Sequence, residues 1–201
     1  MPRETKQSTR AKILVAALEL MESAAGVDGV TMRRVAASAG VTAMATYKHF
    51  RDRDALLRAA TAAEYPRIAS YFARANARTE VPGLRGMLGY FDYAFDHPQI
   101  FRYMFSGIRA DAFVFPGDLD GGKSPTFNVL QAVVSQLMDG GVFQRDDVAE
   151  TALSIWAHAH GLITLHLNGR VTMPRAAFRK LYVRSLDRLL NGLRHRAAIA
   201  G

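Results

Sequence analysis

The chain has 201 residues, of which 49% are hydrophobic, and this is enough for a small domain followed by a larger one with its own core. It contains no cysteine, so disulfides, thiolate metal sites and cysteine nucleophiles are excluded. The formal net charge of +8 favours a polyanionic partner, with an ordinary basic surface as the alternative.

The positive charge is denser in the N-terminal part of the chain. Residues 1–60 carry ten basic and six acidic side chains, and the other 141 residues carry sixteen and twelve. The first ten residues are polar and lack the apolar run of a signal peptide, and no segment approaches the roughly 20 apolar residues of a membrane span. We therefore expect a cytoplasmic protein without a membrane partner.

The first predicted helix begins at Ser8 or Thr9, either of which can cap it. It ends before Gly26 and carries one apolar stripe, formed by Ile13, Leu14, Ala17, Leu18 and Met21.

Residues 31–50 form the most informative segment. Apolar residues at Val35, Ala36 and Ala39 repeat at helical spacing behind a capping Thr31, and Gly40 ends that helix. Thr42 then begins a second short helix that ends near residue 50. Two short helices joined by a tight glycine turn predict a helix-turn-helix, whose second helix enters a DNA major groove while the first crosses the backbone.

The rest of the chain also predicts helices. Asp52 caps a fourth helix that continues towards Ala75, and Pro66 should kink or divide it. A fifth helix stops near His97-Pro98, and a short sixth spans residues 100–105. Residues 107–123 predict an exposed loop, rich in glycine and aspartate. Three more helices cover residues 126–138, 146–167 and about 173–193. With about nine helices and no convincing strand, the fold class is all-α.

Within the predicted second helix of the motif, small or polar residues should meet base edges, where methyl-bearing side chains suit thymine methyls and side-chain hydroxyls can donate or accept hydrogen bonds. These residues are Thr42, Ala43, Met44 and Thr46. The polar groups that follow are better placed for phosphates, and Arg53 at the start of the fourth helix joins them. They are Tyr47, Lys48 and His49.

Further backbone contacts are predicted from the bracing helix and the N-terminal arm. The candidates are Thr31, Arg33, Arg34, Arg3, Lys6, Arg10 and Lys12. For each of the basic residues, a solvated surface charge is the alternative. Phe50 is interpreted as core, whereas the ring of Tyr47 can pack while its hydroxyl reaches outwards.

This order of helices resembles the TetR family of bacterial transcriptional regulators over essentially the whole chain. The residues that carry the resemblance are Thr31, Val35, Ala36, Ala39, Gly40-Val41-Thr42, Tyr47, His49-Phe50, Asp54, Ala55 and Leu56. Trp156 and His160-Gly161 resemble the Trp-His-Gly signature of one body subfamily. Ala45 and Thr46 depart from the threonine and leucine that are frequent before the tyrosine, and this leaves the operator sequence open.

The resemblance implies a DNA-binding domain over residues 1–52 and an effector-binding and dimerisation domain over residues 53–201. It also implies a largely apolar pocket for a small effector. The pocket candidates are Phe91, Phe95, Phe101, Tyr103, Met104, Phe105, Phe127, Asn128, Gln131, Trp156 and His160, with His158 as a further polar candidate.

The last two helices are predicted to form a homodimer interface, with closure of the subunit's own core as the alternative. Ala157 and Gly161 would allow close helix approach. Tyr182, Leu186, Leu189 and Leu193 form a stripe on the final helix. A twofold dimer would present two recognition helices to half-sites about 34–36 Å apart, or a multiple of that.

Other chemistries find little support. His158 and His160 are two residues apart and point to different faces, so they cannot share a metal ion. Ser154 and His158 lack an orienting carboxylate and an oxyanion hole, so no enzyme and no cofactor is predicted. The prediction is a homodimeric repressor released from a palindromic DNA operator by a small apolar or aromatic effector, with the fourth helix as its lever. The alternative is a helical ligand-binding protein or enzyme whose head no longer binds an operator.

Overall fold

A computed structural model describes residues 8–76, 85–105, 114–118 and 124–194. It divides into two compact units: residues 1–66 with 97–112, and residues 67–96 with 113–201. We call them the head unit and the body unit. The division differs from the predicted boundary after residue 52. Arg3 and Lys6 lie outside the described residues, as does most of the predicted loop, of which residues 114–118 form a turn.

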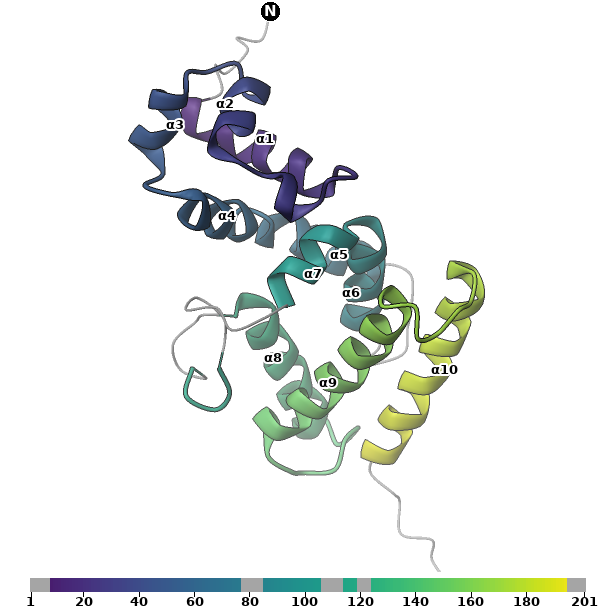
Figure 1. Cartoon of the computed structure of the whole chain (residues 1–201). Coiled ribbons are helices and arrows are strands. Elements are labelled where there is room, and N and C mark those ends of the chain that lie inside the picture. The colour runs from purple at the N-terminus through teal and green to yellow at the C-terminus, as the bar shows by residue number, and fades with distance from the viewer. Residues whose placement is uncertain (1–7, 77–84, 106–113, 119–123, 195–201) are drawn as a thin grey trace, which may run out of the picture. The chain divides into compact units, whose positions relative to one another are not determined.

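The head unit consists of short helices (Figure 1). They are α1 (Thr9–Glu22), the 3-10 helix η1 (Val27–Gly29), α2 (Met32–Ser38), α3 (Ala43–His49), α4 (Arg53–Ala62) and α7 (Pro98–Phe105). The predicted caps are confirmed, because a side-chain oxygen of Ser8, Thr31, Thr42 or Asp52 accepts a backbone N–H three residues on, at 2.7–3.2 Å. Gly40 has a φ of +65°, which favours glycine, at the turn between α2 and α3.

The core of the head unit gathers the apolar stripe of α1. Ile13 and Met21 are fully buried and form one cluster with Val35, Phe50 and Leu56. Phe50 is 4% exposed, which confirms it as a core residue. The core also takes in Ile100 of α7, so this helix, which lies late in the chain, packs with α1. The helix-turn-helix therefore stands on a support drawn from α1, α4 and α7.

The predicted fourth helix is divided in two. The first half is α4, and α5 (Tyr65–Asn76) begins after a two-residue turn. Pro66 is the second residue of α5, where its missing N–H costs no helical hydrogen bond.

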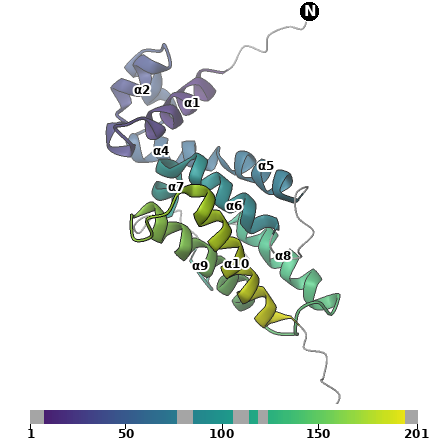
Figure 2. The same cartoon turned by 90° about the vertical axis from the view of Figure 1, so that its right-hand side faces the viewer.

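The body unit contains α5 from residue 67 onwards and four further helices. They are α6 (Arg85–Asp96), α8 (Pro125–Asp139), α9 (Val148–Leu167) and α10 (Arg175–Leu193). In Figures 1 and 2, α9 lies alongside both α8 and α10, and close contacts also join α6 to α9. Gly89 allows α6 to approach α5, because a Cβ atom there would lie 2.8 Å from the backbone of Phe72. The described residues contain no helix long and apolar enough to cross a membrane.

Candidate DNA-binding surface and effector site

The outer face of α3 presents an apolar thioether, a phenol, a lysine and a histidine. Met44 is 69% exposed and Tyr47 is 52% exposed, while Ala43, Lys48 and His49 are also exposed. Residues three and four apart share a helix face, so Met44, Tyr47 and Lys48 form one continuous surface. This is the surface that the sequence predicts for DNA, and we call it the α3 outer face.

Thr46 does not belong to the α3 outer face, and its prediction as a base-contacting residue is wrong. Its side chain is 0% exposed, because the inner side of α3 packs against the head core. Its Oγ1 atom has no hydrogen-bond partner among the residues that the structure describes. The apolar packing position that is usual here is thus occupied by a hydroxyl group.

The two predicted threonines at helix starts are both exposed, and both use their Oγ1 atoms as caps. Thr31 Oγ1 accepts from the backbone N–H of Arg34 at 3.2 Å, and Thr42 Oγ1 accepts from that of Ala45 at 3.1 Å. Each hydroxyl proton is still available to donate to a phosphate or a base edge. The caps therefore position these two groups as well as stabilise their helices.

Arg53 holds the segment before α2 rather than extending towards a ligand. Its Nε donates to the carbonyl of Val30 at 2.7 Å and its Nη2 to that of Val27 at 2.6 Å. Because two of its donors are used inside the head unit, the prediction of a phosphate contact is corrected to a positioning role. Arg34 makes a similar bond to the Gly29 carbonyl at 2.7 Å.

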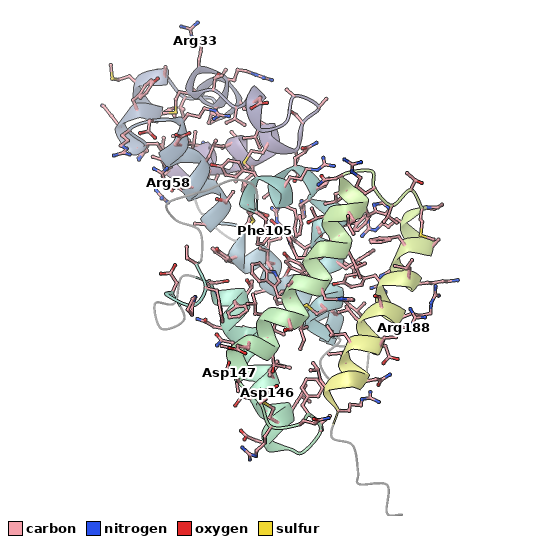
Figure 3. All side chains as sticks on the ribbon, turned by 60° about the horizontal axis from the view of Figure 1, so that its bottom comes forward. Arg33, Arg58, Phe105, Asp146, Asp147 and Arg188 are labelled. Carbon is pink, nitrogen blue, oxygen red and sulfur yellow. The ribbon has the colours of Figure 1, made fainter. Side chains whose placement is uncertain are left out.

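Other predicted backbone contacts remain on the surface. Arg33 is exposed and projects outwards from the head unit (Figure 3). The guanidinium of Arg10 lies over the ring of Phe50, 5.3 Å from its centroid, and Lys12 is exposed. Arg33 and Lys12 are thus exposed cations of the head unit, as Lys48 is. Arg10 is a further cation, but its guanidinium also contacts the Phe50 ring.

A carboxylate that the sequence did not single out joins α1 to α7. Glu22 Oε1 accepts the backbone N–H of Ile100 at 3.2 Å and lies 3.9 Å from Nδ1 of His97. Burial raises the pKa of Glu22 and outweighs the lowering by these two groups. An acidic residue at the end of a helix carries no distinctive sequence signal, so only the fold reveals this contact.

The predicted effector pocket is split between the two units. Phe101, Tyr103, Met104 and Phe105 belong to α7, and Tyr103 and Met104 pack against the core of the head unit. Their assignment to one body pocket is therefore corrected. The prediction followed chain order, whereas α7 packs back onto α1.

Within the body unit, α6 and α9 share a polar network with aromatic walls. The Trp156 Nε1–H donates to the Tyr90 hydroxyl at 3.2 Å, and that hydroxyl lies 2.9 Å from Nδ1 of His160. His160 Nε2 lies 3.2 Å from Oγ1 of Thr164, and the rings of Phe127 on α8 and Trp156 pack in a T-shaped arrangement. We call these five residues the Tyr90 network. Phe127, Trp156 and His160 of this network are among the pocket residues that the sequence predicts, whereas Tyr90 and Thr164 are not.

Both titratable members of the Tyr90 network are held neutral. Burial raises the pKa of the Tyr90 phenol far above its usual value and lowers the pKa of His160. A neutral imidazole protonated on Nε2 fits the contacts, because Tyr90 can then donate to Nδ1 while Nε2 donates to Thr164. The network offers hydrogen bonds without a net charge.

Phe91 and Phe95 lie in a separate aromatic cluster. Their rings stack with centroids 4.4 Å apart, and Phe178 and His166 pack beside them. Phe91 is 0% exposed, so it is part of the core that joins α6 and α10. The remaining polar candidates are on α8, where Asn128 is exposed and Gln131 is half-buried.

An ion-pair group flanks this cluster at the end of α6. Arg175 Nη1 lies 2.7 Å from Oδ1 of Asp96, and the other carboxylate oxygen, Oδ2, accepts a hydrogen bond from the Tyr71 hydroxyl at 2.8 Å. Arg179 donates to both oxygens of Asp92, at 3.3 and 3.1 Å. These contacts tie the last turn of α6 to α5 and α10.

The predicted dimer residues separate into buried and accessible ones. Tyr182 and Leu186 are 0% exposed, and the Tyr182 hydroxyl donates to the Met87 carbonyl at 2.9 Å, so their assignment to an interface is wrong. They close the core of the body unit. The other four remain accessible, with Ala157 exposed and three half-buried, namely Gly161, Leu189 and Leu193.

No group of three or more potential metal ligands occurs among the described residues. His158 lies 3.0 Å from the Ser185 hydroxyl on α10, whereas His160 points to the Tyr90 network. The two histidines thus occupy different faces of α9, as their spacing predicts.

Comparison with known structures supports the same fold. A protein of unknown function from Rhodococcus sp. RHA1 is 24% identical, with 97% of this chain and all of that chain covered and a TM-score of 0.74. A TetR-family transcriptional regulator from Pectobacterium atrosepticum is 20% identical, with coverage of 98% and 99% and a TM-score of 0.70. RolR, solved with its ligand resorcinol, is 15% identical, with coverage of 94% and 89% and a TM-score of 0.64.

Family models cover both parts of the sequence, although none of the curated proteins matches it. Residues 13–60 match the model of bacterial regulatory proteins of the tetR family. Residues 84–189, more than half of the chain, match the tetracyclin repressor-like C-terminal domain. The chain therefore belongs to the TetR family of transcriptional regulators.

Proposed function

We propose that this regulator is a homodimeric repressor that leaves a palindromic operator when its body unit binds a small apolar or aromatic effector. The observation that carries the proposal is the α3 outer face, because a folded helix-turn-helix leaves Met44, Tyr47 and Lys48 accessible there. Such a surface fits a major groove with phosphates on its flanks. Lys12 and Arg33 add exposed positive charge to the same unit.

The Tyr90 network is the proposed effector site of the body unit. Its groups hydrogen-bond in a neutral state, and Trp156 and Phe127 supply flat apolar walls. An uncharged aromatic molecule with one or two hydroxyl or carbonyl groups would replace these hydrogen bonds without burying a charge. RolR, which has a similar fold, was solved with resorcinol, an uncharged aromatic ring with two hydroxyl groups.

The connection from α6 to α7 is the proposed route of the signal. At the end of α6, Asp96 is held by Tyr71 and Arg175 of the body unit. Two residues later α7 begins, and Glu22 of the head unit holds the amide of Ile100. A shift of α6 on effector binding would therefore be passed along the chain to the head unit. A tenfold preference of the effector for one arrangement is worth about 1.4 kcal/mol.

For the homodimer, we propose that α9 contributes Ala157, Gly161 and Leu165. They are spaced by four residues, and Leu165 is 46% exposed. A Cβ atom on Gly161 would meet nothing within 4 Å, so the subunit's own packing does not require this glycine. A glycine at this position would instead allow α9 of a second copy to pack closely against α9 of the first.

A selection of bound genomic fragments tests the proposal against the alternative of a head that no longer binds DNA. The proposal predicts enrichment of a palindrome. A gel shift on that duplex with a panel of small phenols and aromatic ketones then tests release. Lack of any enriched palindrome would support the alternative, and enrichment without release by any compound would indicate a constitutive repressor.

A further inference from the structure

Met44 is the most exposed large hydrophobic residue among those that the structure describes. Its side chain is 69% exposed, in the first turn of α3, and the next most exposed is the 60% of Val114. A partner that removes this apolar side chain from water lowers the free energy of the complex. Its place on the α3 outer face points to the edges of bases as that partner.

Polar groups contribute little to the first turn of α3. Thr46 is buried, and Thr42, at the cap before α3, already uses its Oγ1 as an acceptor and keeps only its hydroxyl proton to donate. Lys48 and His49 lie in the last turn, whereas the first residues of a recognition helix contact base edges. Arginine, asparagine and glutamine do not occur in α3, so the bidentate contacts that these side chains make to guanine and adenine are missing from it. The first turn offers the methyl of Ala43 and the thioether of Met44.

We propose that Met44 is a specificity-determining residue that selects thymine by contact with its C5-methyl group. This methyl is the one apolar group that a standard base pair presents in the major groove. The unbranched thioether side chain of methionine is polarisable and adapts to such a contact. The inference rests on the proposed DNA-binding function and adds to it the base that the operator must carry.

Replacement of thymine by deoxyuridine in the selected operator tests the inference, because it removes only the methyl group. Affinity should fall about fourfold when the contacted thymine of one half-site is replaced, as expected for one buried methyl group. The variant Met44→Ala should bind the thymine and deoxyuridine duplexes equally. Val15→Ala removes another exposed apolar side chain, from α1, and should keep the fourfold difference.

A second duplex separates the methyl group from the base. A 5-methylcytosine·guanine pair at the contacted position should bind better than the cytosine·guanine pair, and Met44→Ala should abolish that gain. If deoxyuridine is tolerated at every thymine, or if Met44→Ala remains sensitive to it, the inference is overturned while the DNA-binding function stands. If no duplex is selected at all, both the function and the inference fail. Circular dichroism should show both variants folded, since both side chains are exposed.

Discussion

Thr46 places a buried hydroxyl group without a described partner in the helix that carries the α3 outer face. A buried polar group left unsatisfied costs about 1–3 kcal/mol. Thr46→Val keeps the shape and removes the hydroxyl, so the free energy of unfolding should rise by about 1 kcal/mol. Denaturation in urea measures this change.

The matched control is Thr61→Val in α4. Thr61 is also buried, but its hydroxyl donates to the Leu57 carbonyl at 3.0 Å, so its removal should bring no gain. Equal effects of the two substitutions would show that the Thr46 hydroxyl is satisfied in solution.

Lys48 is an exposed cation in the last turn of α3, on the flank of the α3 outer face. Lys48→Ala should weaken binding to specific and scrambled duplexes alike, because a phosphate contact carries no sequence information. The slope of log K against log salt should become shallower by about one for each phosphate that the variant no longer neutralises. Fluorescence anisotropy at several salt concentrations measures the slope. Lys180→Ala, on α10, should leave it unchanged, and an unchanged slope for Lys48→Ala would disprove the contact.

Sequence reasoning at the scale of single residues succeeded where the cause is local. Caps at Thr31 and Thr42 and the turn at Gly40 depend on neighbours in the chain, and the structure confirms them. It failed for Thr46 and Tyr182, which were expected on surfaces and are buried. Their helical positions were known, but the direction that each face takes depends on packing between distant segments.

The packing of α6 against α9 should make the stability of the protein depend on pH, because it buries His160. Burial lowers its pKa from the usual 6.5, so between the lowered value and 6.5 the unfolded chain binds more protons than the folded chain. The stability contributed by the neutral imidazole is therefore fully present above pH 6.5 and is lost as pH falls through the lowered pKa. His160→Gln should reduce this loss, which unfolding at a series of pH values measures.

Trp156 gives the same prediction a local signal. It is the single tryptophan of the chain, and its ring centroid lies 5.9 Å from that of His160. Protonation of the imidazole should quench its fluorescence below pH 6.5, and His160→Gln should remove that step. His158→Gln, on another face of α9, should retain it. A step that survives in His160→Gln would assign the titration to another group.

The elements themselves were largely predictable, because helix periodicity and stop signals recur along the chain. Pro66 predicted the division between α4 and α5, and His97-Pro98 predicted the end of α6, whereas α7 begins two residues earlier than the predicted residue 100. The partner of α7 was not predictable, because its contact with α1 depends on Glu22 and Ile100, which are 78 residues apart. Tyr90 of the effector network escaped for the same reason, since it bonds across 70 residues to His160.

At the scale of the whole molecule, the proposed dimer makes one prediction. Gly161→Arg places a long charged side chain in space that is open within the subunit, so the monomer should fold normally. Sedimentation velocity should then show a monomer where the wild type is a dimer. Gly192 lies on α10, and a Cβ atom there would also meet nothing within 4 Å, so Gly192→Arg should remain a dimer. A dimeric Gly161→Arg variant would place the interface elsewhere.

We propose that the α3 outer face gives this TetR-family regulator a specific operator. The most direct test is the affinity of the wild-type protein, at one salt concentration, for its selected palindrome and for a scrambled duplex of the same composition. Binding to the palindrome should be at least about 10³-fold tighter, with one dimer per duplex. Equal affinity for the two duplexes would contradict it.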